Sequence, residues 1–69
     1  MTTLTLATYI NPENVTQDFI VNNVFAHVTS HENLWAEQHA LEMAYDKYHE
    51  VGYYAFDEDG KLVAVCKPQ

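Results

Sequence analysis

Two histidines and two carboxylates lie at helical spacing in EQHALEMAYDKYHE, residues 37–50. His39 and Glu42 are three residues apart, as are Asp46 and His49, so each pair would meet on one side of an α-helix. Imidazoles and carboxylates together can bind a zinc-like divalent ion. The rise of an α-helix places His39 and His49 about 15 Å apart, whereas bonds to zinc are about 2 Å long. The spacing therefore favours a solvated polar face, with a metal-binding protein as the alternative.

The sequence shows no other arrangement that is typical of catalysis. Cys66 is the single cysteine, so neither an internal disulfide nor a thiolate metal cluster can form. It has no histidine or aspartate at a fixed short spacing that would make it a nucleophile. No glycine-rich loop for phosphate is present, and the carboxylates of residues 57–59 fall in a predicted turn rather than a cleft. We therefore expect a protein that is not an enzyme and has no cofactor.

The charge is strongly acidic, with ten Asp and Glu against three Lys and Arg, for a formal net charge of -7. Contact with nucleic-acid phosphates needs a basic patch, which three scattered lysines do not supply. Direct nucleic-acid binding is therefore disfavoured. An acidic surface instead attracts proteins with basic surfaces by electrostatic steering, or it simply keeps a small aromatic-rich protein soluble.

Length and composition predict one folded domain, residues 1–69. A chain of 69 residues cannot divide its apolar side chains between two cores, and a hydrophobic fraction of 48% argues against disorder. The first ten residues lack the positive and apolar regions of a secretory signal, and no apolar run is long enough to span a bilayer. We expect a cytoplasmic protein, complete from Met1, with no membrane partner.

The first half of the chain predicts strands. TLTLATYI alternates apolar and polar residues in a β-favouring composition, and a turn at residues 11–14 follows it. Residues 15–29 place their apolar side chains around the whole helical wheel, which favours a long strand bent or bulged near Asn22 and Asn23. The alternative is a short helix that Asn11 caps, with Pro12 at its first position.

The second half predicts a helix and a hairpin. The helix begins at a Ser30 N-cap, packs one face on a sheet and ends at Gly52. That face consists of the large apolar side chains, with Ala40 and Ala44 at its margin: Leu34, Leu41, Tyr45 and Tyr48. Residues 53–57 and 61–67 then form strands around an Asp-Gly turn.

The predicted order is β-β-α-β-β, an α+β fold in which an antiparallel sheet of about four strands carries one helix on one face. The other face would be unusually apolar for a monomer, given the tyrosine, phenylalanine and valine content of the strands. A structural or complex subunit that pairs with its own copy through this sheet face, as a homodimer, is therefore an alternative.

The candidate partner-binding residues are mostly carboxylates with an aromatic anchor: Glu32, Trp35, His39, Glu42, Asp46, Glu50, Asp57, Glu58 and Asp59. Tryptophan is a frequent hot-spot residue, so Trp35 among carboxylates would suit a basic partner; alternatively it folds beneath the end of the second strand. Carboxylates repeated every four residues lie about 6 Å apart, which is comparable to the spacing of phosphates along nucleic acid. These residues therefore predict a nucleic-acid mimic that binds a protein.

The layout of FIVNNVFAHVTSHENLWAEQHALEMA followed by YYAFDEDGKLVAVCK resembles that of small phage-encoded inhibitors, including inhibitors of host RNA polymerase and anti-CRISPR proteins. The resemblance covers most of the chain as an order of elements and contains no diagnostic motif. It implies a function class: binding and blocking a host protein that handles nucleic acid, in the host cytoplasm. It assigns a role to no individual residue.

Overall fold

A computed structural model describes residues 1–10, 15–32 and 34–69. Its elements follow the order β1 (Thr2–Thr8), α1 (Gln17–Asn23), β2 (Val24–Ser30), α2 (Ala36–Tyr48), β3 (Tyr53–Phe56) and β4 (Leu62–Cys66). The alternating segment at the N-terminus and the C-terminal hairpin are strands, as predicted. The turn predicted at residues 11–14, with the proposed caps Asn11 and Pro12, lies outside the described residues.

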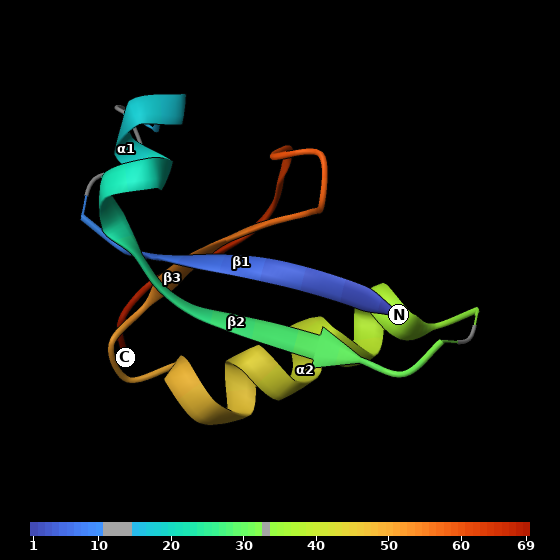
Figure 1. Ribbon diagram of the computed structural model, residues 1–69. Helices are drawn as coiled ribbons and strands as arrows, with labels where there is room; N and C mark the ends of the chain where they lie inside the picture. The colour runs from blue at the N-terminus through green and yellow to red at the C-terminus, as the bar shows by residue number, and fades with distance from the viewer. Residues whose placement is uncertain (11–14, 33) are drawn as a thin grey trace.

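The four strands form one antiparallel sheet in the order β2-β1-β3-β4. Both β2 and β3 pair antiparallel with β1, so they run in the same direction on either side of it. The chain therefore crosses from β2 to β3 through α2, and a helix is the usual connection between parallel strands. In Figure 1, β2 is drawn below β1, α2 lies below both strands and α1 stands at the upper left.

The prediction of one long strand over residues 15–29 is wrong, and the short-helix alternative holds for part of it. Thr16 caps α1, because its side chain accepts a hydrogen bond from the Phe19 N–H at 3.2 Å. The helix ends at Asn23, whose side-chain amide donates to the Phe19 carbonyl at 2.8 Å. The strand then begins at Val24, close to the bend predicted at the two asparagines.

Both faces of the sheet carry a hydrophobic cluster, which corrects the expectation of a single helix on one face. On the α2 side, the buried side chains come from α2, β1, β2 and β3: Leu4, Leu6, Val28, Ala40, Ala44, Tyr53 and Ala55. On the other side, Ile20 of α1 joins Ala7, Tyr54 and Phe56, with Phe19 packed against them. The remainder of that face carries the polar side chains of Thr3, Thr5, His27 and Thr29 and the apolar side chain of Val65, which pairs with Tyr54 and is 44% exposed.

Small residues make the contact between α2 and the sheet. Ala36, Ala40 and Ala44 are buried at 5%, 0% and 0% exposure, so the helix backbone approaches the strands closely. The predicted packing face is therefore partly wrong. Leu41 and Tyr48 do pack against the core, but Leu34 is 94% exposed and Tyr45 is 44% exposed. Leu34 precedes the helix and lies beyond the sheet contact.

The helix begins later than predicted, because Ser30 belongs to β2. Ser30 pairs with Thr2 of β1 and is buried, so its side chain does not cap α2. Trp35 occupies the N-cap position and makes no capping hydrogen bond with its side chain. At the other end the chain turns at Gly52, which has a φ of 72°. This left-handed conformation agrees with the predicted role of Gly52 as the helix terminator.

The C-terminal tail lies against the end of α2. The Gln69 N–H donates to the His49 carbonyl at 3.3 Å, and the Gln69 side-chain amide donates to the Tyr45 hydroxyl at 3.3 Å. Gly52 is buried beside Pro68, with no space for a side chain between them. Within the described residues, no helix has the length and apolar character that crossing a membrane requires.

Candidate functional site

The outward side of α2 gathers several of the predicted partner-binding residues. With Ala36, Ala40 and Ala44 against the sheet, a turn of about 100° per residue sends one flank of the helix to solvent. We call this flank the acidic flank; its residues are exposed, and they are His39, Glu42, Met43, Asp46 and Glu50. Glu42 and Asp46 lie within the helix, whereas Glu50 follows its end at Tyr48. The regular carboxylate spacing of about 6 Å therefore applies to Glu42 and Asp46.

The acidic flank lies on the β2 side of the molecule. The opposite flank of α2 faces β3 and β4, since the Tyr45 hydroxyl accepts a hydrogen bond at 3.3 Å from Gln69, which follows β4, and Tyr45 also contributes to the raised pKa of Tyr53 in β3. The acidic flank therefore points the other way, toward the free edge of β2. Lys47 is the only basic residue of α2, and its Nζ lies 5.5 Å from the centre of the Tyr48 ring.

Trp35 is 70% exposed at the start of α2. This exposure argues against the alternative in which Trp35 folds beneath the end of β2. On the helical wheel Trp35 shares the side of His39 and Glu42, and Leu34 beside it is exposed as well. The structure therefore places an aromatic side chain at the N-terminal end of the acidic flank.

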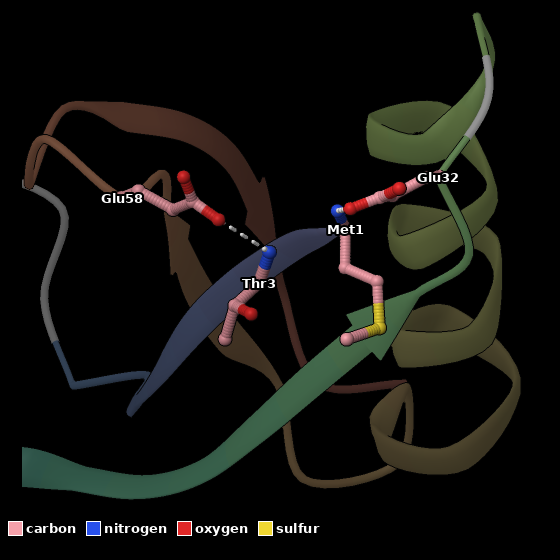
Figure 2. Close-up of polar contacts among 4 residues, drawn as sticks. All are labelled: Met1, Thr3, Glu32 and Glu58. Carbon is pink, nitrogen blue, oxygen red and sulfur yellow. Dashed lines mark hydrogen bonds and ion pairs between the residues drawn. The ribbon is translucent and has the colours of Figure 1, made fainter.

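Glu32 has a local partner. Its Oε1 accepts a hydrogen bond from the ammonium group of Met1 at 2.8 Å, and this hydrogen bond and the positive charge lower the pKa of Glu32. Both groups are largely exposed, so the pair adds little stability. Figure 2 shows Glu32 meeting Met1 beside α2, while Glu58 approaches Thr3 from the other side of β1.

The carboxylates of the β3–β4 turn are not gathered with the acidic flank. Asp57 Oδ1 accepts hydrogen bonds from the backbone N–H groups of Asp59 and Lys61, both at 2.9 Å, which closes the turn. Glu58 Oε1 accepts a hydrogen bond from the Thr3 N–H at 3.2 Å (Figure 2). This bond gives the β1 backbone a hydrogen-bond partner just beyond the end of β3. Figure 1 shows this turn and α2 on different sides of β1. Asp57 and Glu58 therefore have clear structural roles.

The metal and nucleophile alternatives gain no support from the geometry. In the described parts of the chain, no group of three or more His, Cys, Asp or Glu could hold a metal ion. His49 stacks on Tyr45 at 5.1 Å, and its Nδ1 lies 2.8 Å from the Tyr45 carbonyl. Cys66 is half-buried beside Tyr53, and burial, followed by the negative charge of the ionised Cys66 and its hydrogen bond, raises the pKa of Tyr53 to about 12.

A shallow apolar cavity of about 250 Å³, absent from the sequence predictions, lies at the C-terminal end of α2. Its lining residues come from β1, β2 and the turn after α2: Thr8, Phe25, Val51 and Gly52. The register of β1 and β2 shifts between Leu6 and Ala7, which leaves Phe25 as the extra residue of a bulge. Phe25 then reaches the Tyr48 ring at 5.3 Å. The sequence predicted a bend or bulge near Asn22 and Asn23, but no sequence pattern identifies Phe25 as the bulged residue or indicates the cavity.

Comparisons with protein-family models, curated proteins and solved structures found no match for this chain.

Proposed function

We propose that this protein is a non-enzymatic acidic module that binds a basic surface on a protein that handles nucleic acid, and thereby blocks it as small phage inhibitors do. The observation that carries the proposal is the exposure of Trp35 at the head of the acidic flank of α2. An exposed aromatic residue beside carboxylates supplies an anchor and a complementary charge for a basic partner.

The distribution of charge supports binding to protein rather than to nucleic acid. The net charge is -7, and the one lysine of α2 lies over the Tyr48 ring. Glu42 and Asp46 are exposed at about the spacing of successive phosphates, which suits a groove that accepts a nucleic-acid strand. Like charges four residues apart slightly destabilise a helix. A role in binding would explain why Glu42 and Asp46 are both acidic despite this cost.

The experiment is capture of a target from a host extract, followed by affinity measurements on the purified pair. Reversing charge with Glu42→Lys and Asp46→Lys should weaken binding and reduce its dependence on salt, whereas Glu37→Lys on the other flank of α2 is the matched control. Trp35→Ala should weaken binding about 30-fold, as expected for a hot spot of about 2 kcal/mol, with Leu34→Ala as its control. Equal affinity of all variants would contradict the proposal.

Self-association through the sheet face remains the second proposal, with less support. Ile20 and Phe19 of α1 cover part of that face, and the rest presents the polar Thr3, Thr5, His27 and Thr29 together with the exposed Val65. Sedimentation over a concentration series tests it, and a monomer at every concentration would rule it out.

A further inference from the structure

The two edges of the sheet differ in how they are protected against pairing with another strand. Proteins usually guard edge strands with charged residues, prolines or bulges, because a free edge offers unpaired N–H and C=O groups. The β4 edge is short, and Lys61, Lys67 and Pro68 flank it. The β2 edge reads VFAHVTS, with no Asp, Glu, Lys, Arg or Pro. Its bulge lies at the start of the strand and leaves residues 26–30 in regular register.

The hydrogen-bonding direction of each β2 residue follows from β1. The Thr3 N–H donates to Glu58, so it faces the β3 side of β1. Because successive residues of a strand point their N–H groups to opposite sides, Leu4 and Leu6 face β2, where they pair with Val28 and Ala26. The N–H and C=O groups of His27 and Thr29 therefore face outward from the sheet. In the described residues no backbone pairs with this edge.

The acidic flank of α2 lies on the same side of the molecule as the free edge of β2. A strand added beside β2 would lie about 4.8 Å from it, with alternate side chains pointing toward the two faces of the sheet. One set would meet the acidic flank, at His39, Met43 and Asp46, and the other would lie beside the polar His27 and Thr29. Lysine or arginine at every second position of the added strand would therefore best neutralise the carboxylates of the acidic flank.

We propose that β2 is the docking edge for an extended basic segment of the partner protein, which joins the sheet as a fifth strand and sets alternate basic side chains against the acidic flank of α2. This proposal rests on the protein-binding function given above and names its recognition mode. A second copy of the chain is a poorer occupant, because its own acidic flank would approach that of the first. Backbone pairing gives affinity in this mode, and the alternating side chains give specificity.

The test uses the intact protein and a ten-residue peptide in which lysine and threonine alternate. In nitrogen-15 NMR spectra, the peptide should shift the amide signals of His27 and Thr29 and slow their hydrogen exchange. A peptide of the same composition with its lysines in one block should bind at least threefold more weakly. Protection of neither amide, with shifts confined to α2, would overturn the proposal.

Proline variants separate backbone pairing from charge attraction. Thr29→Pro removes an outward N–H and keeps the bonds to β1, so it should abolish the protection and weaken peptide binding at least tenfold. The same alternation makes the Val65 N–H point outward from β4, and Val65→Pro is therefore the matched control, with binding unchanged. Circular dichroism checks that both variants fold. If Thr29→Pro unfolds, Thr29→Lys takes its place, because a charge guards the edge without removing the N–H.

Charge variants and self-association complete the test. Glu42→Gln with Asp46→Asn should weaken peptide binding at least threefold, while Glu37→Gln should leave it unchanged. A dimer that Thr29→Pro disperses would overturn the proposal, because a second copy would then occupy the edge. If the captured target loses affinity for the charge-reversed protein but binds Thr29→Pro normally, the proposed function holds and the edge-pairing mode fails.

Discussion

Replacing Gly52 with alanine tests how the C-terminal tail is held against the end of α2. Gly52 has a φ of 72°, and a Cβ in the left-handed region costs about 1–2 kcal/mol. A Cβ at this position would lie 2.6 Å from Pro68 Cδ and 2.8 Å from both Cγ and the backbone nitrogen. The tail must therefore move, and the hydrogen bond from Gln69 to His49 would be lost, at about 0.5–1.5 kcal/mol. We expect Gly52→Ala to lower the free energy of unfolding by about 2–3 kcal/mol.

Gly60 supplies the matched control. It also has a positive φ, of 81°, but its Cβ would meet Gln17 Oε1 at 3.6 Å, an ordinary contact. Gly60→Ala should therefore show the conformational cost alone, about 1–2 kcal/mol. Both substitutions place a Cβ in a left-handed backbone conformation. Only Gly52→Ala also displaces the C-terminal tail.

The measurement is urea denaturation followed by far-ultraviolet circular dichroism, with thermal unfolding as a second probe. A loss of 1 kcal/mol lowers the Tm of a domain of this size by about 4–8 °C, so the two variants are easily resolved. Deleting Pro68 and Gln69 from both the wild-type protein and Gly52→Ala should reduce the cost of the substitution to that of Gly60→Ala. Equal losses for Gly52→Ala and Gly60→Ala in the full chain would refute the reasoning.

Three further predictions concern packing and ionisation. Ala40 is fully buried between α2 and the sheet, so Ala40→Leu should cost about 1–3 kcal/mol in urea denaturation, whereas the exposed Gln38→Leu should cost about 0.5 kcal/mol or less. Because burial and the Cys66 thiol raise the pKa of Tyr53 from 10.0 to about 12, the stability from its neutral form is complete below pH 10.0 and is lost as the pH rises toward 12. Tyr53→Phe should flatten this alkaline fall in the urea midpoint, and an equally steep fall would contradict the assignment. The Met1 ammonium lowers the pKa of Glu32, so the pair stabilises the protein above the ordinary Glu pKa and loses its effect as the pH falls through the lowered one. Acetylating Met1 should raise the Glu32 pKa in an NMR titration, and an unchanged value would show that the contact is absent in solution.

The strands β1, β3 and β4 could be predicted because local sequence determines them. Alternation of apolar and polar residues gives β1, and the Asp-Gly turn joins β3 to β4, where Asp57 closes the turn with its own carboxylate. The short helix α1 was not predicted as the first choice, because only one of its seven side chains, Ile20, is buried. One buried side chain does not produce an apolar stripe on a helical wheel. Thr16 is of a residue type that favours the N-cap, but the helical alternative assigned the cap to Asn11.

The start and the packing face of α2 depended on contacts distant in sequence. Ser30 is a good N-cap by type, but its pairing with Thr2 extends β2 through it. The spacing of Ala36, Ala40 and Ala44 was visible in the sequence, yet the preference for large apolar residues assigned the core to Leu34 and Tyr45. The acidic flank was predictable from helical periodicity, whereas its position above a free strand edge required the sheet order.

The position of β1 also bears on how the chain folds during synthesis. β1 is made before the other three strands, but it lies between β2 and β3 and buries Leu4 and Leu6 beneath α2. Its pairing with Phe56 joins residues far apart in the chain, and such distant contacts slow folding. Until β3 leaves the ribosome, β1 therefore exposes an uncharged edge that can pair with other chains. An early β1–β2 pair would protect one side of it, and the segment through Phe56 is the shortest nascent chain that can protect both.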